Sequence, residues 1–199
     1  MKPKLVVIAG PNGSGKTSVT DKILQHEWIE GCIYINPDYI ARDEFGDWNS
    51  PEAVYKAAKR AEQIRENCLI NKQGILFETV LSADDKLSFI KRAKEAGYFI
   101  RLFFVGTDSP TINAARIANR VMEGGHDVPI SKIISRYSKS IANCAKISGI
   151  VDRLYVYDNS VDFADPKLLF RASEGRIEKT YQQINFWSEN IYKNLLLQL

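Results

Sequence analysis

The chain has 199 residues, 45% of them apolar, and a formal net charge of +3, which fits a globular domain large enough to bury a core. No apolar run approaches the ~20 residues that a membrane-spanning helix needs, and the run Lys4–Ala9 is too short for a signal peptide. We therefore expect a cytoplasmic protein that does not bind membranes. Because the basic residues are spread along the chain rather than clustered, we expect no nucleic-acid partner.

Short apolar runs alternate with helical patterns along the chain. Leu5–Ala9 is a continuous apolar run, typical of a parallel strand that is buried on both faces. Four later runs have the same character: Ile33–Ile35, Ile75–Phe77, Phe99–Val105 and Leu154–Tyr157. This order predicts an α/β fold, with a mostly parallel sheet and helices on both of its faces.

Capping residues mark the helices between these strands. Ser50 is expected to cap a helix with Pro51 at its first position, and Ser82 with Asp85 forms a capping-box pattern. Glycines mark the helix ends. The expected helices cover about residues 51–73, 82–97, 110–123, 130–148 and 184–197.

The C-terminal part of the sequence has a different pattern of predicted elements. Leu168–Ala172 and Ile177–Tyr181 flank a Glu-Gly turn, which predicts a hairpin, and a final helix follows. We treat residues 1–199 as one domain, with a small helical lid at about 110–148 and a C-terminal extension at about 161–199. Three aromatic residues of the final helix are expected in the core: Phe186, Trp187 and Tyr192.

A phosphate-binding loop lies between the first strand and a helix. The stretch Gly10-Pro-Asn-Gly-Ser-Gly-Lys16-Thr17 fits the pattern G-x-x-x-x-G-K-[ST] at every fixed position. Glycines allow backbone N–H groups to surround an anion, Lys16 supplies a charge to the β- and γ-phosphates, and the Thr17 hydroxyl suits Mg²⁺. The expected ATP-binding residues are Gly10, Pro11, Asn12, Gly13, Ser14, Gly15, Lys16, Thr17 and Ser18.

Other nucleotide-binding classes fit less well than a kinase. An Asp-x-x-Gly occurs at Asp43–Gly46, but no apolar strand precedes it and no guanine-recognition motif follows. The sequence also lacks an ABC-type signature. These features favour a compact kinase with a P-loop kinase-like three-layer sandwich, and they imply ATP and Mg²⁺ as its cofactors.

Polar residues follow three of the expected strands, at the edge of the sheet where ligands bind. Asp38 follows the second strand and could accept the proton of an acceptor hydroxyl, although Asn-Pro-Asp is also good turn chemistry. Glu78 and Thr79 end the third strand and could hold the acceptor, with Glu78 alternatively binding water on Mg²⁺. Asn159 follows the strand Leu154–Tyr157, at a place where kinases of this type contact adenine, and its neighbour Asp158 could alternatively bind a metal ion.

Arginines flank a glycine-rich segment. Arg116 and Arg120 are four residues apart and share one helix face, and Arg136 lies on the next helix. The segment 124–129 between them, Gly-Gly-His-Asp-Val-Pro, suggests a hinge. Such a lid could bring arginines to a transferring phosphoryl group, although ordinary solvated arginines have the same pattern.

These motifs together resemble the zeta toxin family of P-loop kinases. The resemblance rests on the glycine loop, Asn36-Pro-Asp38, Phe77-Glu78-Thr79 and Arg120-Val-Met-Glu-Gly-Gly-His-Asp-Val-Pro129, in this order over about residues 4–160. It implies that ATP and Mg²⁺ serve phosphorylation of UDP-N-acetylglucosamine, and that an antitoxin protein is a partner. It further implies Lys16 as the phosphate lysine, Asp38 as general base, and arginines on the γ-phosphate: Arg116, Arg120 and Arg136.

One position departs from the family pattern. Toxins of the family carry Glu-x-Thr-x-Arg after the third strand, whereas Val80 and Ser82 replace the Thr and Arg here. A sugar-nucleotide diphosphate would lose a charged contact at this place. A dinucleotide, an aminoglycoside or a nucleoside therefore stays open as the acceptor, as does an ATP-gated binding module without transfer activity.

Overall fold

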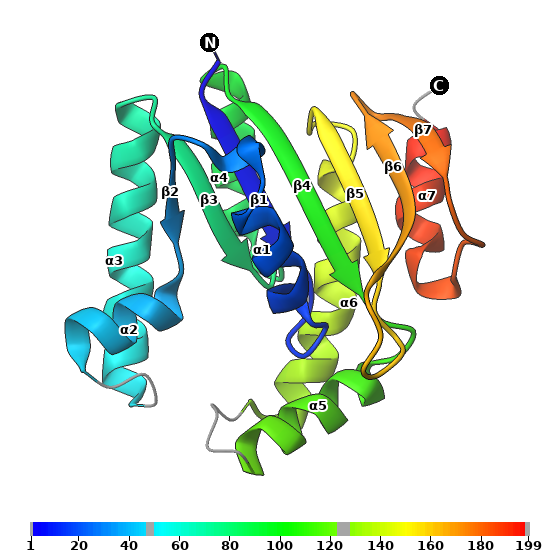
Figure 1. Ribbon diagram of the computed structural model, residues 1–199, viewed down its shortest axis with the longest axis horizontal. Coiled ribbons are helices and arrows are strands. Elements are labelled where there is room, and N and C mark those ends of the chain that lie inside the picture. Colours follow the sequence, from blue (N-terminus) through cyan, green and yellow to red (C-terminus); the bar gives the residue numbers. More distant parts are fainter. Residues whose placement is uncertain (1, 47–49, 123–127, 198–199) are drawn as a thin grey trace.

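The fold is given by a computed structural model, which describes residues 2–46, 50–122 and 128–197 (Figure 1). Its centre is a seven-stranded sheet in the order β2-β3-β1-β4-β5-β6-β7. The strands are β1 (Lys4–Ala9), β2 (Cys32–Ile35), β3 (Gly74–Thr79), β4 (Phe99–Gly106), β5 (Arg153–Asp158), β6 (Lys167–Ser173) and β7 (Arg176–Thr180). Strands β1 to β5 are parallel, and β6 and β7 add an antiparallel hairpin. The predicted mostly parallel sheet and the C-terminal hairpin are thus confirmed.

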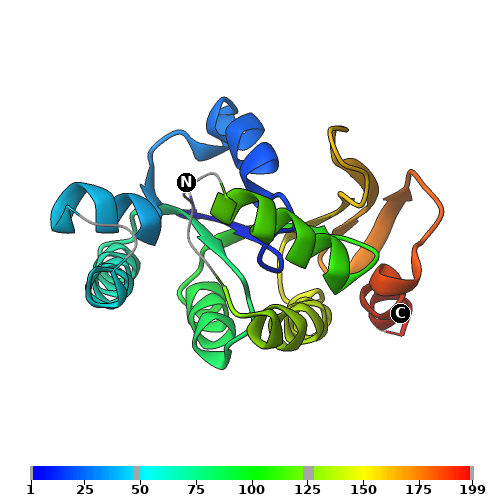
Figure 2. The ribbon, with the colours of Figure 1, turned by 90° about the horizontal axis from the view of Figure 1, so that it is seen from below.

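Helices cover both faces of this sheet. They are α1 (Lys16–Leu24), α2 (Pro37–Phe45), α3 (Pro51–Ile70), α4 (Asp84–Glu95), α5 (Pro110–Met122), α6 (Ile130–Ile147) and α7 (Glu189–Leu196). Helix α1 lies on one face, and α3, α4 and α6 lie on the other (Figure 2). Within the described residues, no helix combines the length and the apolar character that crossing a bilayer requires.

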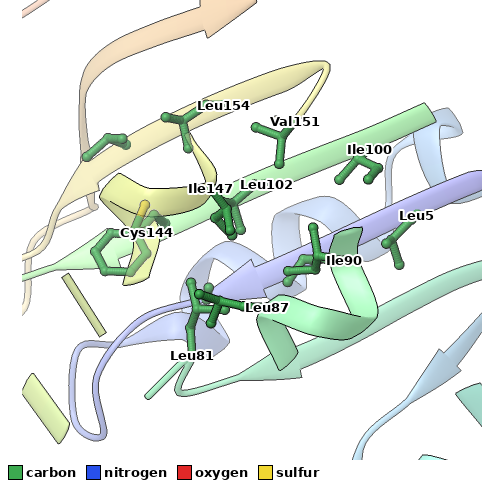
Figure 3. Close-up of a cluster of buried hydrophobic side chains, with 14 of the residues drawn as sticks. Leu5, Leu81, Leu87, Ile90, Ile100, Leu102, Cys144, Ile147, Val151 and Leu154 are labelled. Carbon is green, nitrogen blue, oxygen red and sulfur yellow. The ribbon is translucent and has the colours of Figure 1, made fainter. Parts of the chain in front are cut away.

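The central strand β1 explains why the apolar runs are continuous. Leu5 and Val7 pack into the larger core beneath α4 and α6, whereas Val6 and Ile8 pack into a second core beneath α1. Side chains of a strand alternate between faces, so a strand covered on both sides must be apolar throughout. Figure 3 shows part of the larger core, in which Ile90 of α4 faces the strands.

The carboxyl ends of the parallel strands share one edge of the sheet. In Figure 1 the arrows of β1 to β5 point to the lower edge, where α2, α5 and the start of α6 lie. The connection from β1 to α1 turns at the same edge. The fold therefore gathers the segments that follow β1, β2, β3 and β4.

Helix starts were predicted with mixed success. The Ser50 cap is confirmed, because its Oγ accepts the Ala53 N–H at 3.1 Å. The capping box at Ser82 is wrong: Ala83 is the N-cap of α4 and makes no side-chain cap bond. The chain enters α4 through Leu81, whose left-handed φ of 58° leaves Ser82 outside the helix.

Two further features differ from the sequence-based expectations. Helix α2 was not predicted; it begins because the Asn36 side chain accepts the Asp38 N–H at 2.9 Å and Pro37 takes the first helical position. At the C-terminus, Trp187 is buried as expected, but Phe186 is 92% exposed and its predicted core position is wrong. These two residues are adjacent in a short 3₁₀ turn, so when one ring enters the core its neighbour faces solvent. Tyr192 is half-buried against Phe170, with ring centroids 5.1 Å apart.

Trp187 fixes the C-terminal segment to the end of β4, and this contact requires a glycine. A Cβ on Gly106 would lie 2.3–2.7 Å from atoms of the Trp187 ring. We expect Gly106→Ala to lower the free energy of unfolding by about 1–3 kcal/mol through overpacking. Urea denaturation followed by circular dichroism measures the change.

The matched test is the same substitution in a Trp187→Ala background. There the added methyl meets no ring, so Gly106→Ala should cost much less than in the natural chain. Equal costs in the two backgrounds would contradict the contact.

Candidate active site

The glycine loop depends on close packing against two asparagines. Gly13 has a φ of 74° and Gly15 a φ of 83°, which disfavour any side chain at these positions. A Cβ on Gly13 would lie 2.5 Å from the Asn113 carbonyl oxygen, and one on Gly15 would lie 2.1 Å from Asn159 Nδ2. The loop follows β1 directly and Lys16 begins α1, which is the context that the motif predicts.

Lys16 lies at the centre of the site. Its ammonium group donates to the carbonyl oxygens of Gly10 at 2.9 Å and Pro11 at 3.0 Å. Burial lowers the Lys16 pKa to about 8; the charge of Glu78 and, more weakly, that of Asp38 oppose this shift, whereas the charge of Arg120 adds to it. The fold thus brings residues from β3, α2 and α5 around one ammonium group, in an arrangement that can hold terminal phosphates.

Two carboxylates of the site differ in their surroundings. Asp38 is exposed in the first turn of α2, where it can reach a ligand without losing an existing side-chain partner among the described residues. Glu78 accepts a 2.6 Å hydrogen bond from the Tyr34 hydroxyl, which in turn accepts one from Asn36 Nδ2 at 3.0 Å. Burial and the Glu78 carboxylate raise the pKa of Tyr34 well above its usual range, so Tyr34 remains a hydrogen-bond donor.

Tyr34 is a site residue that sequence reasoning missed. The available signal was strand periodicity, because Tyr34 and Asn36 are two residues apart at the end of β2 and can face the same side. Thr79, by contrast, was predicted to hold the acceptor and uses its hydroxyl within the chain. Thr79 Oγ1 accepts the Leu81 N–H at 3.0 Å and shapes the loop that follows β3.

The three predicted arginines are placed differently. Arg116 donates through Nε to Asp162 at 2.7 Å, and its buried Nη1 lacks a hydrogen-bond partner while lying 4.0 Å from the position of a Cβ on Gly15. Arg120 is close enough for its charge to lower the Lys16 pKa. Arg136 lines a surface hollow formed by α6 and the loop after β3. The predicted hinge residues 124–127 lie outside the described residues.

A second group of site residues that sequence reasoning missed supports the glycine loop through hydrogen bonds. Asn113 Nδ2 donates to the Asn12 carbonyl at 2.6 Å, and the Asn113 side-chain oxygen is bonded by Thr107. The Tyr137 hydroxyl donates to the Thr107 carbonyl at 2.5 Å, which extends the network to α6. Such buried polar networks fix a unique geometry when every member has a partner.

Asn159, predicted to contact the nucleotide, holds the loop on its other side. Its Nδ2 donates to the Ser14 carbonyl at 2.9 Å, and its N–H donates to the Gly106 carbonyl. The preceding Asp158 accepts the Ser160 hydroxyl at 2.6 Å and Trp187 Nε1 at 3.1 Å. Asp158 therefore orders the turn after β5.

Two side chains near the glycine loop, those of Arg116 and Thr17, could contact a nucleotide and its cation. The unpartnered Arg116 Nη1 beside the loop is suited to an anionic group. Thr17 is exposed in the first turn of α1, where one hydroxyl can complete the shell of a cation that phosphates also bind. Among the described residues no cluster of three or more His, Cys, Asp or Glu side chains could hold a metal ion.

Comparison with known proteins identifies the family pattern over most of the chain. The model of the zeta toxin family matches residues 1–165. An uncharacterised protein of Haemophilus influenzae is 29% identical over 137 residues, which cover 69% of this chain and 94% of that protein.

Solved structures share the fold at low sequence identity. The AvrRxo1-ORF1–ORF2 complex with ATP matches with a TM-score of 0.71 at 16% identity, over 98% of this chain and 63% of that chain. The present chain thus spans less than two thirds of that protein's length. A chain from the structure of the PezAT chromosomal toxin–antitoxin system of Streptococcus pneumoniae matches with a TM-score of 0.60 at 16% identity, over 99% of this chain and 87% of that chain. These likenesses confirm the P-loop kinase-like fold.

The lowered Lys16 pKa gives a measurable proton linkage. In the free protein the ammonium loses its proton near pH 8, whereas bound phosphates would hold it protonated. We expect binding of the ATP analogue AMP-PNP with Mg²⁺ to take up protons at pH 8–9, and its affinity to fall as the pH rises through this range. Calorimetry in buffers of different ionisation enthalpy measures the uptake.

Lys16→Arg is the matched control, because arginine keeps its charge throughout this pH range. The proton uptake should vanish in this variant. Equal uptake in both proteins would assign the linkage to another group.

The Asn113 brace predicts a change in nucleotide affinity. Asn113→Ala leaves the Asn12 carbonyl without its partner, a loss of about 1–3 kcal/mol, so we expect binding of AMP-PNP with Mg²⁺ to weaken about tenfold. Asn119→Ala, an exposed asparagine on the same helix, should leave the dissociation constant unchanged. A fall in melting temperature without a change in affinity would limit Asn113 to a structural role.

Proposed function

This chain belongs to the zeta toxin family, and on that premise we propose that it is an ATP-dependent kinase that phosphorylates a hydroxyl of a small molecule. The observation that carries the proposal is the surroundings of the Lys16 ammonium group. The glycine loop bonds it through the Gly10 and Pro11 carbonyl oxygens, and Asp38, Glu78 and Arg120, from three separate elements, lie close enough for their charges to act on it. The family match and the kinase-like fold support the same activity.

In the proposed reaction Asp38 accepts the proton of the acceptor hydroxyl while that oxygen bonds to the γ-phosphorus of ATP. The bond from the γ-phosphorus to the β–γ bridging oxygen breaks, and ADP leaves with that oxygen. Lys16 holds the β- and γ-phosphates, and arginine side chains stabilise the charge on the transferred group. Arg116 and Arg120 are best placed for this on α5; Arg136 is the third candidate. Mg²⁺, with Thr17 among its ligands, would neutralise phosphate charge.

The acceptor side of the site is formed by Asp38, Glu78 and the loop that follows β3. Tyr34 orients the Glu78 carboxylate, which leaves the second carboxylate oxygen for an acceptor hydroxyl. UDP-N-acetylglucosamine is the first acceptor to test because of the family. Its diphosphate would meet Ser82 where the family pattern has an arginine, so the test must include other acceptors.

Two further properties follow from the family as proposals. The first is inhibition by an antitoxin protein. When such a protein binds the kinase, turnover of the kinase should be lost. The second is a location in the cytoplasm, where ATP is supplied.

The decisive measurement is acceptor-dependent release of ADP together with the mass of the product. Asp38→Asn should lower the rate of phosphoryl transfer about 100-fold or more, because the general base is lost, while AMP-PNP binding is retained. Lys16→Ala should weaken both binding and transfer. Asp43→Asn, on the same helix and paired with Arg42 at the surface, is the matched control and should transfer at the natural rate.

Undiminished transfer by Asp38→Asn would remove the base assignment. Binding of ATP without ADP release for any acceptor would favour an ATP-gated binding module.

A further inference from the structure

The loop that joins β5 to β6, residues 159–166, reaches the lower edge of the sheet, where α5 lies (Figure 1). Hydrogen bonds to two other segments fix its first residues. Asn159 Nδ2 donates to the Ser14 carbonyl of the glycine loop at 2.9 Å. The N–H of Asp108, which follows β4, donates to Ser160 Oγ at 2.9 Å. The start of this loop is therefore tied to the phosphate-binding end of the sheet.

The middle of the loop presents Asp162 to Arg116 of α5. Arg116 Nε donates to Asp162 Oδ1 at 2.7 Å, with the arginine side chain 20% exposed and the aspartate side chain 62% exposed. Ion pairs at the surface add little to stability. The next residue, Phe163, has a left-handed φ of 59° and a fully exposed ring. Contacts around this turn, and not burial of the ring, therefore maintain a backbone that is unfavourable for phenylalanine.

The bond to Asp162 determines where the other donors of Arg116 point. The guanidinium group is planar, so an acceptor on Nε fixes the directions of both Nη groups. Nη1 is buried, has no hydrogen-bond partner among the described residues, and lies 4.0 Å from the position of a Cβ on Gly15. Asn159 Nδ2 lies 2.1 Å from the same position. A buried donor without a partner is unfavourable, and a ligand in the glycine loop would supply the missing acceptor.

We propose that Asp162 is a positioning residue for nucleotide binding, which holds the Arg116 guanidinium so that Nη1 meets an acceptor atom of a nucleotide in the glycine loop. The inference rests on the proposed function, because it takes this loop as the ATP site. The negative charge of Asp162 by itself repels phosphates, so its contribution comes from orientation. An asparagine, whose side-chain oxygen accepts the same hydrogen bond without the charge, separates the two effects.

The binding test measures the dissociation constant of AMP-PNP with Mg²⁺ by calorimetry. In Asp162→Ala the guanidinium loses its acceptor and can rotate, so we expect the constant to rise about tenfold. Asp162→Asn keeps an acceptor and should stay within about twofold of the natural chain. Asp165→Ala is the matched control: it removes the same charge from the same loop, where Asp165 pairs with Lys22 of α1, and should leave the constant unchanged.

A double-mutant cycle shows whether Asp162 acts through Arg116. In an Arg116→Ala background, Asp162→Ala should change the dissociation constant by less than about twofold. An equal loss in both backgrounds, or no loss in the natural chain, would overturn the positioning role. So would a loss in Asp162→Asn or in Asp165→Ala as large as that in Asp162→Ala, because either result would assign the effect to charge. Melting temperatures show that the variants are folded.

The orientation itself is visible in the Nε–H resonance of Arg116, which the variant Arg116→Lys assigns. A hydrogen-bonded Nε–H exchanges slowly with water. We expect a sharp resonance in the natural chain and in Asp162→Asn, and its loss by fast exchange in Asp162→Ala. A resonance that Asp162→Ala leaves unchanged would contradict the contact.

These measurements need no turnover, which separates them from the test of the kinase. If the natural chain binds AMP-PNP but transfers phosphate to no acceptor, the kinase proposal fails and the cycle still decides the role of Asp162. If the natural chain does not bind AMP-PNP, both proposals are overturned.

Discussion

The site depends on the positive charge of Lys16, which lies in a buried position where desolvation disfavours a charge. The Lys16 ammonium is enclosed by the glycine loop and bonds two of its carbonyl oxygens, yet its pKa is lowered to about 8. The carbonyl dipoles replace only part of the solvation that water would give the ammonium group. An ammonium group in this state is stabilised by an anion that enters the loop, so the loop geometry suits phosphate.

Other parts of the molecule keep the loop in this geometry. Asn113 and Asn159 bond carbonyl groups on either side of it, and both glycines between them would clash if they carried a side chain. The Asn113 bond continues through Thr107 to Tyr137 of α6. The phosphate loop is therefore part of a continuous hydrogen-bond network that reaches α5 through Asn113 and α6 through Tyr137.

The sequence predicted the features that depend on short local patterns. The apolar runs gave the parallel strands, because burial on both faces forces a continuous run, and the glycine loop was recognised from its fixed positions. The features that it could not predict depend on distant partners. Tyr34 matters through Glu78, which is 44 residues away, and Asn113 through Asn12, which is 101 residues away. Local capping rules also failed at Ser82, where the left-handed Leu81 and its bond to Asn143 set the start of α4.

The hairpin of β6 and β7 has a consequence for the solubility of shortened chains. It covers the edge of β5, and the outermost strand carries exposed charges at Arg176, Glu178 and Lys179. Charged side chains on an edge strand discourage pairing with other molecules. A chain cut after β5 would expose an edge that contains Leu154 and Val156, and it would lose Trp187 from the end of β4. Such a fragment would be prone to aggregate through open strand edges, even though it keeps the whole phosphate loop.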